Sequence, residues 1–183
     1  MSFYRVVWRI VWPAAGAALL AGGVLGPGGH SAVVSAAAPP WMRVDAAHKL
    51  ASFTVTAAQG GANGTLNFNG YANGRLTVTV PTGWRVHIDF VNSGAGALPH
   101  SFEVIRDTGK IPPQGIEPPA IPRAETGNLI AGVPPMRKDT VDFIAAPPGR
   151  YLWFCGVPSH GISGMWNRFV VGAGAGMPAV TIK

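Results

Sequence analysis

Stretches in which hydrophobic and polar residues alternate run through most of the chain from residue 52 onward. In 85–92, for example, Val86, Ile88 and Phe90 alternate with charged or polar residues. Such alternation is typical of a strand with one buried and one solvated face. Strands are predicted at 52–58, 65–70, 75–81, 85–92, 100–106, 140–146, 150–155 and 165–172. Short strands separated by Gly- and Pro-containing turns predict an all-β sandwich or small barrel.

One long segment, 107–139, interrupts this pattern. It holds seven prolines and has no hydrophobic period, so it cannot form central strands. A loop of this length in a compact domain is usually functional or serves as a packed cover. Asn63 begins a glycosylation triplet, but its setting favours an ordinary turn.

The first 38 residues differ from the rest. Arg5 and Arg9 precede an apolar run over 10–25, and small residues follow it. This order is typical of a secretory signal peptide, and a retained N-terminal membrane anchor is the alternative. We therefore expect a segment 1–38 for export and a domain 39–183 outside the cytoplasm, either periplasmic or attached to the outer face of the cytoplasmic membrane.

Charge and cysteine content narrow the function further. The net charge is +6, but the basic residues are scattered, which does not favour nucleic-acid binding. With a single cysteine, the chain can form no internal disulfide.

That cysteine lies in the stretch "FCGVPSHGISGM" (154–165), where Cys155, His160 and Met165 follow one another with four residues in each gap. Each residue alone fits core packing. A tight loop between neighbouring strands, however, brings all three side chains towards one point. A thiolate, an imidazole and a thioether form a soft donor set that selects copper, whereas structural zinc sites usually hold several cysteines. A blue-copper site of this kind requires a second histidine.

Four histidines are candidates for this ligand. His30 lies in the expected signal segment and His48 precedes the first clear strand. His87 falls on the solvated face of its strand, and we expect it to be simply solvated. His100 stands where a Gly/Ala/Pro loop enters a strand, at an end of the sandwich, and is the best placed of the four.

The residues "LPHSF" (98–102) and "GRYLWFCGVPSHGISGMW" (149–166) together resemble the type 1 copper motif of the cupredoxins, and within them the sulfocyanin and rusticyanin-like group. "LNFNGYANGRLTVTVPTGW" (66–84) also resembles the first strands of sulfocyanins. The resemblance covers roughly 63–172. It implies a single cupredoxin-type Greek-key β-sandwich whose copper motif lies within 98–166.

The same resemblance implies one type 1 copper, cycling between Cu(I) and Cu(II), with His100, Cys155, His160 and Met165 as its ligands. Many cupredoxins have Asn directly after the first histidine, and Ser101 stands there in this chain. The apolar residues near the ligands predict a high potential.

The expected function is electron transfer between redox proteins such as cytochromes or a terminal oxidase, by a monomer that is not an enzyme. A copper oxidoreductase domain would need further histidines for additional copper centres, often in His-x-His pairs. The chain contains no His-x-His pair. A copper chaperone or storage protein would favour several exposed Met or His ligands, and the sequence shows no such set.

A docking face is expected where two loops meet around His160. These loops contribute small or apolar residues, namely Gly94, Ala95, Gly96, Ala97, Leu98, Pro99, Val157, Pro158, Gly161 and Ile162. Exposed apolar patches of this kind mark interaction sites.

Overall fold

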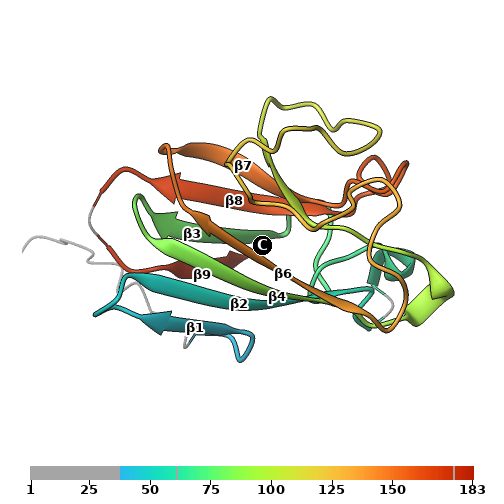
Figure 1. Ribbon diagram of the computed structural model, residues 1–183, viewed down its shortest axis with the longest axis horizontal. Helices are drawn as coiled ribbons and strands as arrows, with labels where there is room; N and C mark the ends of the chain where they lie inside the picture. Colours follow the sequence, from blue (N-terminus) through green and yellow to red (C-terminus); the bar gives the residue numbers. More distant parts are fainter. Residues whose placement is uncertain (1–37, 61, 175) are drawn as a thin grey trace, which may run out of the picture. The chain divides into compact units, whose positions relative to one another are not determined.

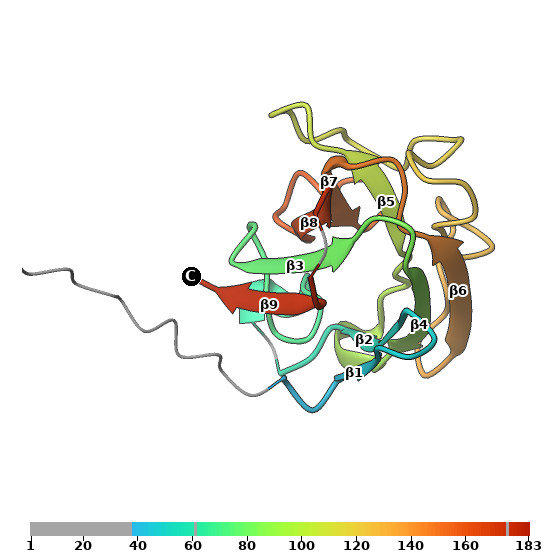
Figure 2. The same ribbon diagram turned by 90° about the vertical axis from the view of Figure 1, so that its left-hand side faces the viewer.

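The computed structural model describes residues 38–60, 62–174 and 176–183, and the expected signal or anchor segment falls almost entirely outside them. The described part is built from two β-sheets packed face to face (Figures 1 and 2). One sheet has the order β1-β2-β4-β6, made of Met42–Asp45, Leu50–Ala57, Arg85–Asn92 and Lys138–Ile144. The other has the order β5-β7-β8-β3-β9, made of Glu103–Arg106, Gly149–Phe154, Trp166–Gly172, Leu76–Pro81 and Ala179–Ile182. The all-β sandwich predicted from the alternating pattern is confirmed.

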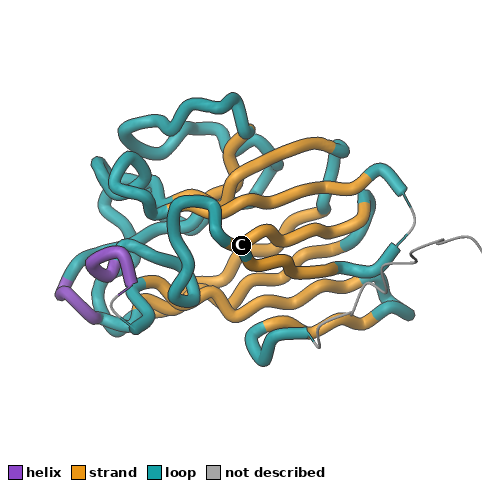
Figure 3. Tube along the Cα trace, turned by 180° about the vertical axis from the view of Figure 1, so that it is seen from behind, coloured by secondary structure: helices purple, strands orange, loops and turns teal. Residues whose placement is uncertain are grey.

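Neighbouring strands are mostly distant in sequence. The pairs β2–β4 and β3–β8 are parallel, and the other pairs are antiparallel. Parallel neighbours require crossovers between the sheets, which interleave the two halves of the chain. As a result, the loop after β4 and the loop after β7 lie at the same end of the sandwich (Figure 1). This is the end at which Figure 3 shows the short helical turns in purple among the loops.

The core between the sheets is rich in aromatic rings. Trp153 of β7 packs against Phe53, Phe102 and Phe169, with ring centroids 5.4–5.9 Å apart. Aromatic pairs at these distances add to the stabilisation that burial alone supplies. The inward positions of β7 lead directly to Cys155, so this rigid cluster supports the end of the strand from which the cysteine projects.

The predicted strand at 65–70 is wrong. Only Phe68 forms bridges, while two asparagine side chains take over the bonding that a strand would supply. Asn69 accepts the Thr56 N–H and donates to the Thr54 carbonyl, and Asn67 accepts the Gln59 and Gly70 N–H groups. Asn side chains compete with regular backbone pairing in this way.

The other differences are at the margins. Strands β1 and β9 were not predicted, because each has only four residues and little hydrophobic pattern. The strand predicted at 100–106 begins only at Glu103, because His100 and Phe102 bond instead to the long loop. Among the described residues, no helix has the length and hydropathy to cross a membrane. The helical elements are the short turns Ala62–Thr65 and Ala95–Ala97.

Candidate metal centre

The loop between β7 and β8 folds back on itself and brings Cys155, His160 and Met165 together. The Cys155 N–H donates to the Met165 carbonyl at 3.2 Å, and the Met165 N–H donates to the His160 carbonyl at 3.0 Å. The side chains of Cys155 and Met165 are fully buried, whereas His160 is half-buried. The two gaps of four residues therefore close into one compact turn, as the spacing predicted.

Gly161 allows this turn to pack. A Cβ at this position would overlap the ring of Phe154, the last residue of β7. The backbone beside His160 can approach the strand only because no side chain intervenes.

His100 comes to the same place from the loop after β4. The Asn92 side chain, at the end of β4, donates to the Leu98 and Val133 carbonyls and accepts the Gly94 N–H. The His100 backbone exchanges two hydrogen bonds with Val133, at 3.2 and 2.7 Å. The long loop thus holds the histidine from one side while β4 holds it from the other.

Three donor atoms converge at this point. Ligand atoms of His100, Cys155 and His160 all lie within 4.8 Å of one another. The Cys155 Sγ is 3.5 Å from the His160 Nδ1, and the two imidazole centroids are 5.0 Å apart. The structure therefore brings together three of the four residues singled out from the sequence. Backbone contacts place the fourth, Met165, beside them.

The two nitrogens of His100 are the strongest indication of a metal-binding site here. Both are buried, and neither has a hydrogen-bond partner within the described part of the chain. A buried polar atom without a partner costs about 1–3 kcal/mol. A metal ion would satisfy one of these nitrogens.

The protonation states agree with a ligand role. Burial, together with the nearby His160, lowers the pKa of His100 to about 4, and burial also lowers the pKa of His160. Both rings are therefore neutral at neutral pH, the form that binds a metal. Burial raises the pKa of the Cys155 thiol to about 11, so without a metal the sulfur keeps its proton.

Ser101 organises the surroundings of the sulfur. Its backbone N–H points at the Cys155 Sγ at 3.4 Å. Its hydroxyl donates to the Leu129 carbonyl and accepts the Gly156 N–H at 2.9 Å. The serine thus ties the His100 segment, the long loop and the cysteine loop together. The sequence drew attention to this serine because it directly follows His100. Its contacts with distant segments could not be predicted from the sequence.

The long loop, predicted at 107–139, ends where β6 begins at Lys138. It covers the site, which is one of the two roles that its length and composition suggested. The Gly115 N–H donates to the Gly156 carbonyl, and the Ser159 N–H donates to the Pro113 carbonyl, both at 2.8 Å. Together with the Val133 bridge to His100, these contacts bind the loop to both ligand segments.

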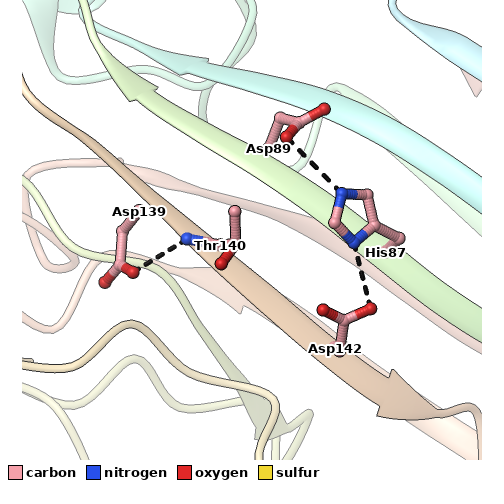
Figure 4. A network of polar contacts seen from close by, with 5 residues as sticks. All are labelled: His87, Asp89, Asp139, Thr140 and Asp142. Atoms are coloured by element: carbon pink, nitrogen blue, oxygen red, sulfur yellow. Dashed lines mark hydrogen bonds and ion pairs between the residues drawn. The ribbon is translucent and has the colours of Figure 1, made fainter.

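The remaining histidines lie away from this cluster. His48 is exposed and contacts Asp45 at 2.7 Å. His87 is not simply solvated as expected: its side chain is 32% exposed and lies between Asp142 at 3.0 Å and Asp89 at 3.4 Å (Figure 4). The hydrogen bond with Asp142 raises the pKa of His87. His30 falls outside the described residues.

Comparison with known proteins agrees with this geometry. The family model for the sulfocyanin (SoxE) domain matches residues 40–182. Rusticyanin from Acidithiobacillus ferrooxidans is 32% identical over 102 residues, which is 52% of this chain and 49% of rusticyanin. Rusticyanin from Acidithiobacillus ferridurans is 31% identical over the same shares. The chain thus spans about half the length of the curated relatives it matches.

Two solved structures complete the comparison. A rusticyanin structure matches 72% of this chain and 86% of its own, with 22% identity and a TM-score of 0.47. Reduced auracyanin from Roseiflexus castenholzii matches 66% and 96%, with 22% identity and a TM-score of 0.48. Since the family model spans most of the chain and the His/Cys/His cluster lies within it, this protein is a cupredoxin that belongs to the sulfocyanin family.

Proposed function

We propose that this protein is a single-electron carrier that uses one type 1 copper bound by His100, Cys155, His160 and Met165. The observation that carries the proposal is the pair of buried, unpartnered nitrogens on His100, within 4.8 Å of the donor atoms of Cys155 and His160. Two imidazoles and one thiolate, with a weak axial thioether, are the donor set of blue-copper electron-transfer sites.

A bound copper would supply the Cu(II)/Cu(I) couple at this position. The protein's own residues hold the donors in place. Cys155 directly follows β7, the β7–β8 turn carries His160, and β4 with the long loop holds His100. Because these segments are tied to one another, little needs to move when the charge changes. The Ser101 N–H directed at the sulfur and the apolar burial both favour the reduced site and hence a high potential.

An electron carrier suits this arrangement better than an enzyme. The large side chains around Cys155 are packed, and within the described residues the His/Cys/His group is the single cluster of this kind. A copper reductase or oxidase would need a second centre to bind its substrate. A copper chaperone would need exposed ligands, whereas His100, Cys155 and Met165 are buried.

The visible spectrum of the copper-loaded, oxidised protein tests the proposal. We expect an intense thiolate-to-copper charge-transfer band that disappears on reduction. The variant Cys155→Ser should lose the band. A wild-type protein that remains colourless with stoichiometric Cu(II), or that takes up zinc alone, would overturn the assignment.

The partners are expected to be redox proteins such as cytochromes or a terminal oxidase, docking at the end of the sandwich that carries His160. Two large apolar side chains are exposed on the ligand loops, Leu98 at 38% and Ile162 at 57%. Apart from the histidines themselves, neither ligand loop contains an acidic or basic residue between 93 and 101 or between 155 and 165. Val157, expected in this patch from the sequence, is buried and is not part of it. Such a small, uncharged patch supports brief encounters by a monomer rather than a permanent complex.

The basic start and apolar run of residues 1–38 support export. Electron transfer would then take place in the periplasm or at the outer face of the cytoplasmic membrane, with the segment either removed or kept as an anchor.

A further inference from the structure

Apart from the metal centre, a cavity lies between the edge strand β5 and the first part of the long loop. It is a cavity of about 410 Å³. This volume falls in the range of small-molecule sites, roughly 300–1,000 Å³. Its apolar walls come from Ile105, Ile111, Pro112, Ile116, Pro118 and Ala120.

The walls are held in place without a ligand. The Ala120 N–H donates to the Val104 carbonyl of β5 at 2.8 Å. The Ile116 N–H donates to the buried carboxyl group of Glu103 at 3.2 Å, and the neighbouring Gly115 is bonded to Gly156. The loop is thus fixed to β5 and to the cysteine loop, so the cavity is preformed. Preformed sites lose less free energy to ordering when they bind.

The cavity is apolar yet positively charged. Arg106 and Lys110 line it together with the neutral Thr108, and no carboxylate is among its lining residues. Within the described part of the chain, neither cation has an ion-pair partner, and the adjacent Asp107 faces Arg150 at 3.6 Å. The guanidinium of Arg106 lies over the ring of Tyr151, which does not line the cavity, so Lys110 is the cation available to a bound molecule. Glu117 lies next in sequence to Ile116 but does not line the cavity. Ile116 is 48% exposed, which leaves apolar surface in contact with water.

We propose that this cavity binds a small amphipathic anion, an apolar body that carries one carboxylate. The apolar body lies between the isoleucines, and the carboxylate lies beside Lys110. The cavity is concave and sized for one small molecule, which favours a free anion over a lipid surface. This site is independent of the copper assignment, because none of the four proposed ligands lines it.

Binding of decanoate to the full, copper-loaded chain, followed by isothermal titration calorimetry, tests the proposal. We expect saturable binding of one decanoate per chain and weaker binding of 1-decanol, which has the same carbon chain without the charge. Lys110→Glu should weaken decanoate binding about tenfold, because an attraction becomes a repulsion. Ile116→Asp should weaken it as well, because a carboxylate then enters the apolar wall.

Lys49→Glu is the matched control, since it makes the same change in net charge at an exposed position that does not line the cavity. An unchanged far-ultraviolet circular dichroism spectrum shows that each variant is folded. The proposal is overturned if decanoate shows no saturable binding, if Lys49→Glu weakens binding as much as Lys110→Glu, or if binding is seen with phosphatidylglycerol vesicles and not with decanoate.

Discussion

His87 and His100 belong to two regions of the molecule and differ in what surrounds their ring nitrogens. His87 lies on the outer face of the β4–β6 pair, where Asp142 and Asp89 occupy both nitrogens. His100 lies at the end of the sandwich, fully buried, and both of its nitrogens lack a partner. Only seven residues separate the end of β4 from His100, so the two rings are close in sequence but differ in their surroundings.

The two environments move the pKa values in opposite directions. The carboxylate of Asp142 favours the charged ring and raises the pKa of His87. Burial disfavours the charged ring and lowers the pKa of His100 to about 4. A histidine whose nitrogens already bond to carboxylates is a surface ion pair, whereas a neutral, buried and unpartnered imidazole is ready to bind a metal.

The largest expected effect comes from removing each histidine in turn. His100→Ala should abolish the blue-copper band and most of the copper-induced rise in the melting temperature, because a ligand that stabilises the folded state by binding is lost. His87→Ala should keep both. Scanning calorimetry with and without copper, together with the visible spectrum, measures this, and equal losses in the two variants would remove the distinction between the two environments.

A smaller effect is expected from Met165, the buried residue beside the three converging donors. Met165→Leu should keep copper and raise the potential by about 60 mV, which is a tenfold change in the ratio of reduced to oxidised protein. The reason is that loss of a weak donor to Cu(II) favours Cu(I). Met165→Gln should lower the potential. Redox titration measures both, and no shift in either variant would exclude Met165 as a ligand.

The same substitution at two exposed isoleucines, one on a ligand loop and one on β6, tests where the redox partner docks. Ile162→Lys adds a charge beside His160 and should slow electron transfer to the redox partner about tenfold, because a charge must be desolvated on docking. Ile144→Lys is the control, since Ile144 is exposed to a similar extent, 46% against 57%, but lies on β6.

Stopped-flow measurements give both rates, and the spectrum and potential should stay unchanged in the two variants. Transfer should depend weakly on ionic strength. A steep salt dependence, or equal rates in Ile162→Lys and wild type, would place the docking surface elsewhere.

The smallest effect concerns the acidic pair around His87. The pKa of His87 is raised in the folded protein, so the ion pair between His87 and Asp142 stabilises the fold below the unfolded histidine pKa of about 6.5. This stabilisation is lost as the pH rises through the folded-state pKa of His87. Asp142→Asn should therefore lower the free energy of unfolding by about 0.5 kcal/mol at low pH, because the pair is partly exposed.

Urea unfolding of the metal-free protein at about pH 5 and about pH 8.5 measures this difference, on either side of the ordinary histidine pKa. The variant and the wild type should converge at the higher pH. An equal loss at both values would assign the effect to packing rather than to charge.

The sequence by itself determined the strands with clear alternation and the candidate ligands. In β4, three apolar side chains at every second position require one face to be inside, whatever the partner strands are. Cys155, His160 and Met165 lie within one short loop between two strands, so their proximity is a local property of the chain. Very short strands such as β1 and β9 carry too few residues for a pattern to emerge.

The tertiary structure decided the features that depend on contacts between distant segments. Asn67 and Asn69 form loop contacts because β2 lies beside them, which no pattern in 65–70 records. The partners of His87 come from the pairing of β4 with β6, and the lack of partners at His100 comes from its burial under the long loop. Hydrogen bonds and burial are short-ranged in space but not in sequence, so the fold alone distinguished a paired histidine from one left free to bind a metal.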